Sequence, residues 1–106
     1  MTFRSTLFAA AILLPFTAYA EDYTLTIKDH AFSPAELSVP AGQKFKLTVK
    51  NMDTTPAEFE SHDLKREKVI APGASVVIPL GQLKAGSYSF VEEYHEDVAK
   101  GTLTAK

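Results

Sequence analysis

The sequence predicts an all-β fold, a small Greek-key β-sandwich of about seven strands. After residue 21, apolar and polar residues alternate over short runs, which is typical of half-buried antiparallel strands. Proline and glycine separate these runs at the spacing expected of a β-sandwich. Since no stretch keeps a helical period for long, we expect a single all-β domain.

The first half of this domain contains two clear strand signals. Residues 23–28 and 44–51 each place three apolar side chains on one face, as strands that cover a core do. These side chains are Tyr23, Leu25 and Ile27 in the first run and Phe45, Leu47 and Val49 in the second. Between the two runs, residues 30–43 predict one short edge strand that ends in a turn.

The second half supplies the remaining strands. They are expected at the "EFE" of residues 58–60 and within residues 71–80, 83–93 and 100–106. Alternation along the third of these puts Tyr88 and Phe90 on a shared face. The polar segment 61–69 predicts an exposed helical turn instead of a strand.

Residues 1–20 have the features of a secretory signal peptide. Arg4 supplies the positive start, an apolar segment follows, and an Ala18-x-Ala20 pattern precedes the acidic residues at the expected cleavage point. The apolar segment is too short to span a bilayer, although a retained anchor is the alternative. We therefore expect cleavage after Ala20 and a periplasmic domain of residues 21–106 that is not an integral membrane protein.

Composition excludes several classes of function. Without residues 1–20 the chain has 10 basic and 13 acidic residues, because Arg4 is the only charged residue removed, and the net charge is −3. Scattered and outnumbered basic residues argue against nucleic-acid binding. The chain has no cysteine, so thiol redox chemistry, thiolate ligation and cysteine nucleophiles are excluded.

The order of these elements resembles that of the cupredoxins, the azurin and plastocyanin superfamily of copper-binding sandwiches. The resemblance covers nearly all of residues 21–106 and rests on "FSPAELSVPAGQKFKLTVKN", the loop "NMDTTPAEF", a Pro-Gly hairpin, "LKAGSYSF" and "KGTLTAK". The runs "FSPAELSVPAG", "EFESHDLKREKVIAPG" and "LKAGSYSF" look still more like a cysteine-free cupredoxin branch among bacterial periplasmic components of ferrous-iron uptake.

The resemblance also implies where copper ligands would fall. Blue copper proteins use two histidines, a cysteine and usually a weak axial methionine. Carried over by position, the cysteine falls on Glu92 and the second histidine on His95. The first histidine falls on Ala57, and the methionine falls on Ala99 or Lys100. Because no thiolate exists, the resemblance implies handling of copper or iron with acidic ligands and not blue electron transfer.

Independently of the resemblance, "EEYHED" gathers oxygen donors around one imidazole. The candidate metal ligands in this stretch are Glu92, His95, Glu96 and Asp97. Glu92 continues the inward face of the preceding strand, where an unpaired carboxylate would be costly and a cation would remove the cost. A solvated acidic loop is the alternative interpretation.

A second group of candidate metal ligands lies in "EFESHD". Glu58 and Glu60 share the face opposite Phe59, and His62 follows just past the strand. We expect these three residues to help bind the same cation, the alternative being an exposed edge strand whose charges discourage aggregation. His30 is expected at the surface, with no part in the site.

Two functions of different classes remain open on this sequence. The first is a metal-binding protein that handles iron or copper for inner-membrane or periplasmic iron-uptake partners, with at most an accessory role in ferrous-iron oxidation. The second is a metal-free cupredoxin scaffold that docks another uptake component, favoured if Lys100 neutralises Glu92 or Glu93. A hydrolase is disfavoured because no serine stands beside a histidine in a recognisable arrangement.

The signal peptide generates the first prediction. Protein purified from the native host or a bacterial periplasm should begin at Glu21, because the charged start, apolar segment and Ala18-x-Ala20 pattern agree. Intact-mass measurement checks this. A product that keeps residues 1–20 and stays in the membrane fraction would contradict it.

Overall fold

Nine strands and one short 3-10 helix make up residues 22–106, the part of the chain that the computed structural model describes. In chain order they are β1 (Asp22–Lys28), β2 (Ala31–Ser33), β3 (Glu36–Val39), β4 (Lys44–Asn51), β5 (Ala57–Ser61), β6 (Arg66–Ile70), β7 (Ser75–Gly81), β8 (Gly86–Glu92), η1 (Glu93–His95) and β9 (Lys100–Ala105). The predicted signal peptide lies outside the described residues.

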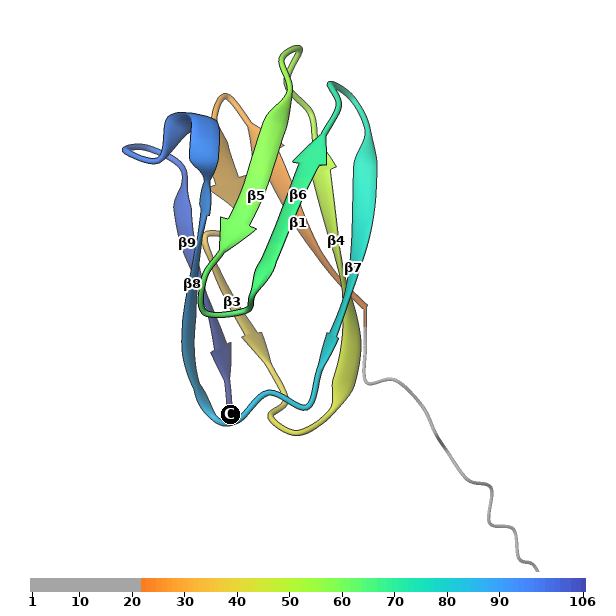
Figure 1. Cartoon of the computed structure of the whole chain (residues 1–106), viewed down its shortest axis with the longest axis vertical. Coiled ribbons are helices and arrows are strands. Elements are labelled where there is room, and N and C mark those ends of the chain that lie inside the picture. The colour runs from red at the N-terminus through yellow and green to blue at the C-terminus, as the bar shows by residue number, and fades with distance from the viewer. Residues whose placement is uncertain (1–21) are drawn as a thin grey trace, which may run out of the picture.

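The strands form two sheets that pack on each other around one core (Figure 1). One sheet has the order β2-β1-β4-β7 and the other β3-β9-β8-β5-β6, which confirms the predicted all-β sandwich. Most strand pairs are antiparallel, as the alternation predicts, but β1 pairs with β4 and β3 with β9 in parallel. The chain leaves the first sheet through β3 before β4 returns to it, and this excursion lets β4 run in the direction of β1.

Two elements differ from the sequence prediction and account for the larger number of strands. The single edge strand expected within residues 30–43 is two strands, β2 and β3, which lie at the edges of different sheets. The helical turn expected at residues 61–69 is a turn followed by β6, an edge strand that pairs with β5. Most side chains of β6 are exposed, so no alternation of apolar residues marked it as a strand.

An aromatic cluster lies in the core near one end of the sandwich. The ring centroid of Phe90 is 4.8 Å from that of Phe32 and 5.5 Å from that of Phe59. Phe59 is paired with Glu92 across β5 and β8. Figure 1 shows that η1, the β1–β2 turn and the β4–β5 loop meet at this end, opposite the C-terminus. The aromatic rings therefore lie beneath the part of the fold that carries the polar candidates.

Asn51, at the end of β4, organises the same end of the molecule. Its side chain is fully buried, and Nδ2 donates to the carbonyl oxygens of Thr55 at 2.9 Å and Ile70 at 3.1 Å. Oδ1 of Asn51 accepts from the backbone N–H of Asp53 at 3.0 Å. One amide side chain thus joins β4, the β4–β5 loop and the end of β6.

These contacts predict that Asn51→Ala destabilises the protein on the order of 3 kcal/mol, because each buried partner left without a hydrogen bond costs about 1–3 kcal/mol. Urea unfolding measures the change. Lys50→Ala, at an exposed neighbouring position, is the matched control. Equal and small effects of both substitutions would contradict the role given to Asn51.

Candidate metal site

Glu92 is a buried carboxylate at the end of β8. Its residue is 1% exposed, which confirms the predicted inward orientation. Oε2 accepts from the backbone N–H of Glu58 at 2.8 Å and of Tyr94 at 3.1 Å, and Oε1 lies 2.5 Å from Nδ1 of His95. The cost of an unpaired carboxylate is therefore avoided without a cation, because two amides and an imidazole contact Glu92.

His95 lies against a second histidine that the sequence did not place in the site. The rings of His95 and His30 stack with centroids 3.7 Å apart and planes 17° apart. His30 lies at the surface, as expected, with its side chain 42% exposed, but its contact with His95 was not predicted. The β1–β2 turn brings it back over η1, and turn geometry gives no periodic signal from which this contact could be predicted.

Asp53 fixes the turn that carries His30. Its carboxylate accepts the backbone N–H groups of Asp29 at 2.6 Å and His30 at 3.0 Å, and Oδ2 also lies 3.5 Å from Nδ1 of His30. Burial acts to raise the pKa of Asp53, but the hydrogen bonds from His30 and Asp29 outweigh it and hold the pKa below its ordinary value. Asp53 is thus an anion that positions the turn.

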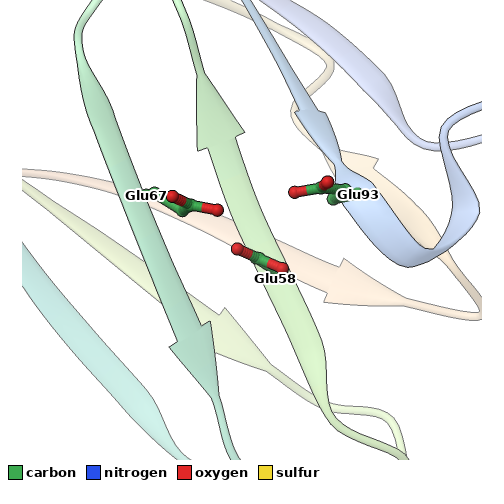
Figure 2. A group of neighbouring side chains, drawn as sticks. All are labelled: Glu58, Glu67 and Glu93. Carbon is green, nitrogen blue, oxygen red and sulfur yellow. The ribbon is translucent and has the colours of Figure 1, made fainter.

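Three carboxyl groups gather on the outer face of the five-stranded sheet β3-β9-β8-β5-β6. Glu58 of β5, Glu67 of β6 and Glu93 of η1 each offer an oxygen, and these oxygens lie within 4.8 Å of one another. Figure 2 shows Glu67 of β6 and Glu93, at the start of η1, pointing toward each other, with Glu58 of β5 between them. We call this group the carboxylate triad.

Protonation in the triad differs from that of solvated glutamates. A hydrogen bond with Glu67, followed by burial and the charges of Glu93, Glu67 and Glu60, raises the pKa of Glu58 to about 7. A hydrogen bond with Glu60 and burial likewise raise the pKa of Glu93. Oε1 of Glu93 is buried and has no hydrogen-bond donor among residues 22–106. A shared proton or a cation would satisfy this oxygen.

The other predicted ligands lie apart from Glu92. Glu60 is on the outer face beside the triad, and Nε2 of His62 is 3.5 Å from its carboxylate, but the His62 side chain is 93% exposed. Glu96 and Asp97 are exposed and line a depression beside β9. The seven predicted residues therefore do not form one cluster, because alternation along β5 sends Glu58 and Glu60 to the face opposite Glu92.

Two positions to which the resemblance assigns copper ligands are occupied by alanine. Ala57 and Ala99 are buried and carry no donor side chain. Lys100 is exposed, and no ion pair joins it to Glu92 or Glu93 in the described part of the chain. The suggestion that Lys100 neutralises the site was wrong, because the side chain that contacts Glu92 is His95 and not Lys100.

Sequence reasoning missed Glu67 and Glu93 as members of the triad. Glu93 stands in the acidic run "EEYHED", but which sheet face it joins depends on where β8 ends. Glu67 lies in β6, the strand that had no periodic signal, and it is paired with Glu60. Acidic residues on adjacent strands would predict the triad only if the strand register were already known.

The fold is a sandwich of two β-sheets, and the sequence supplies no thiolate to its polar end. The sequence matches the family described as cupredoxin-like domain over residues 4–105, and the chain belongs to this family. It is 47% identical over 79 residues to the uncharacterized protein RP394 of Rickettsia prowazekii (strain Madrid E). That alignment covers 74% of this chain and 63% of the relative, so the chain spans less than two thirds of the relative's length.

Solved structures agree on the fold. Reduced auracyanin of Roseiflexus castenholzii superposes with a TM-score of 0.67 at 19% identity, covering 84% of this chain and 99% of that protein. Auracyanin A, a "blue" copper protein of Chloroflexus aurantiacus, gives 0.69 at 15% identity, with 82% and 100% covered. A purple cupredoxin of Nitrosopumilus maritimus gives 0.62 at 18% identity, with 78% and 98% covered.

A type 1 copper centre does not fit the residues present. It requires a cysteine thiolate, and the sequence has none. Glu92, which stands in its place, already accepts two backbone hydrogen bonds and faces His95.

Residues 22–106 contain no helix with the length and apolar character that a bilayer crossing needs.

The raised pKa of Glu58 predicts how stability depends on pH. In the folded state Glu58 keeps its proton up to about pH 7, whereas the unfolded chain loses it near 4.5, so stability falls as pH rises through that window. Glu58→Gln removes this fall in stability, because glutamine does not titrate. Its free energy of unfolding should match that of the wild type near about pH 4 and exceed it near about pH 8. Urea titrations at both pH values measure the difference.

The control for this prediction is Glu36→Gln, which removes an exposed charge of β3 outside the triad. Its stability difference from the wild type should change little across the same pH window. The interpretation of the triad is contradicted if both substitutions give the same pH profile.

Proposed function

We propose that this is an exported metal-binding cupredoxin-like protein that handles iron in ferrous-iron uptake and binds it at the carboxylate triad. The observation that carries the proposal is the buried Oε1 of Glu93, which has no donor in the described chain and lies beside two further carboxyl groups. A cation would give this oxygen a partner and would relieve repulsion among three like charges.

The ligand type favours iron over copper at this position. Carboxylate oxygens are hard donors and suit Fe(II), Fe(III) or Mn(II), whereas copper gains more from imidazole or sulfur. The triad draws on β5, β6 and η1, so the sheet itself sets the spacing of its oxygens. Iron held by solvent-accessible carboxylates can be passed to a partner, as an uptake component requires.

The compartment and the partners in this proposal rest on features of the sequence. The features of residues 1–20 support export, and the similarity of "EFESHDLKREKVIAPG" to the ferrous-iron branch supports partners among periplasmic or inner-membrane uptake components. No turnover is assigned to the protein in this proposal.

A metal-free docking scaffold is the second candidate. Two observations favour it: Glu92 is satisfied without a cation, and Met52, Tyr94 and Val98 expose apolar surface at the same end of the sandwich. Exposed apolar residues around a polar site are suited to transient contact with another protein. Metal analysis of untagged protein from the periplasm distinguishes the two candidates.

The triad predicts metal-dependent stabilisation. Fe(II) under anaerobic conditions, or Mn(II) in air, should raise the free energy of unfolding by about 2.7 kcal/mol at a hundredfold excess over the dissociation constant. Glu67→Gln should remove most of this rise. Affinity should fall as pH drops below about 7, because Glu58 must release its proton to bind the ion. Thermal unfolding with and without the ion is the measurement.

Glu36→Gln serves as the matched control and should keep the full stabilisation. Two results would contradict the iron proposal and favour the metal-free docking scaffold. The first is an unfolding temperature that neither ion changes, and the second is an equal response in the Glu67→Gln and wild-type proteins.

A further inference from the structure

The outer face of the four-stranded sheet β2-β1-β4-β7 is rich in lysine. Burial alternates along β4, so its apolar residues point into the core while Lys44, Lys46 and Lys50 point outward. The parallel register places Thr26 of β1 beside Lys50, and Lys28 is the next outward residue of β1. We call the surface formed by Lys28, Lys44, Lys46 and Lys50 the lysine face.

Carboxylates are almost absent from this face. In the described strands of the sheet, Asp22 is the only acidic residue at an outward position, and it lies opposite Lys46. No ion pair joins Lys28, Lys44 or Lys50 to a carboxylate within residues 22–106. The charges of these three lysines are therefore not neutralised by the described part of the chain.

Negative charge is collected on the opposite side of the sandwich. Glutamates occupy outward positions of β3, β5 and β6 in the five-stranded sheet, namely Glu36, Glu58, Glu60 and Glu67. Lys100, at the start of β9, is an exception. Because the two sheets pack on each other, positive and negative faces point in opposite directions. An anionic surface would attract one face and repel the other, and so would select a single orientation.

The lysine face is extended and has an apolar edge. Lys44 and Lys50 are about 20 Å apart along β4, at about 3.4 Å per residue. Val77 of β7 is 52% exposed and is paired with Thr48, which lies between Lys46 and Lys50. Basic residues with an apolar side chain beside them suit a bilayer interface, where lysine contacts phosphate and the apolar group enters the headgroup region. Lipids diffuse laterally to meet the lysines, whereas an acidic protein would have to match their spacing.

We propose that the lysine face binds the surface of a membrane that contains anionic phospholipids. The protein then lies on the bilayer as a peripheral domain, with β1 and β4 against the headgroups and the edge of β7 at the interface. The carboxylate triad, on the other sheet, faces away from the lipid and stays accessible from the aqueous side. This inference does not depend on which ion the triad binds.

Co-sedimentation with lipid vesicles tests the surface. Protein purified from a bacterial periplasm, with an intact mass that shows residues 1–20 to be absent, should bind vesicles that contain phosphatidylglycerol. It should not bind vesicles of phosphatidylcholine alone. Binding should weaken as salt is raised from about 0.05 M to about 0.5 M, because the Debye length shortens. The double variant Lys44→Gln, Lys50→Gln should lower the partition coefficient on the order of twentyfold.

A second double variant, Lys84→Gln with Lys100→Gln, is the matched control. Both lysines are exposed and lie outside the lysine face, so this variant has the same net charge as the first but should bind vesicles nearly as well as the wild type. Equal losses in the two double variants would overturn the proposal, and so would a wild type that does not bind. Binding to poly-glutamate but not to phosphatidylglycerol vesicles would assign the face to an acidic protein and would also overturn it.

The orientation on the vesicle can be measured separately, because the chain has no cysteine. A single Val77→Cys or Glu36→Cys substitution therefore accepts one environment-sensitive dye at a defined position. Emission from the dye at position 77 should shift to the blue when phosphatidylglycerol vesicles are added, whereas the dye at position 36 should not respond. An equal shift at both positions, or no shift at position 77, would contradict binding through the lysine face.

Discussion

The buried carboxylate of Glu92 is the constraint on which the polar end of this sandwich depends. A polar group taken out of water is tolerated when hydrogen bonds replace its hydration. Here the amides of Glu58 and Tyr94 and the imidazole of His95 supply those contacts. The carboxylate consequently fixes the start of β5, the fold of η1 and the ring of His95 relative to one another.

The same contacts connect the two faces of one sheet. The amide of Glu58 points to the inner carboxylate, while its side chain belongs to the outer triad with Glu67 and Glu93. A change in charge at the triad acts on the residue whose backbone holds Glu92. The stacked rings of His30 and His95 and the triad share η1, which carries both His95 and Glu93.

Loss of the thiolate changes what this fold can do. Family membership and structural similarity establish the sandwich, but the site decides the chemistry. With Ala57 and Ala99 at two former ligand positions, the molecule retains neither the soft ligands nor the enclosed geometry of a blue copper centre. What remains are three carboxyl groups on the outer face of one sheet and two stacked imidazoles beside Glu92 and Asp53 at the end of the sandwich.

The sequence by itself determined the sandwich, the absence of thiol chemistry and the inward orientation of Glu92, because period-2 alternation assigns each strand residue to a face. The tertiary structure alone decided the parallel pairings, strand β6, the partners of Glu92 and the approach of His30 to His95. Alternation carries no information on which strands become neighbours. The contact between the β1–β2 turn and η1 depends on which strands are neighbours, and so does the carboxylate triad, which is built from β5, β6 and η1.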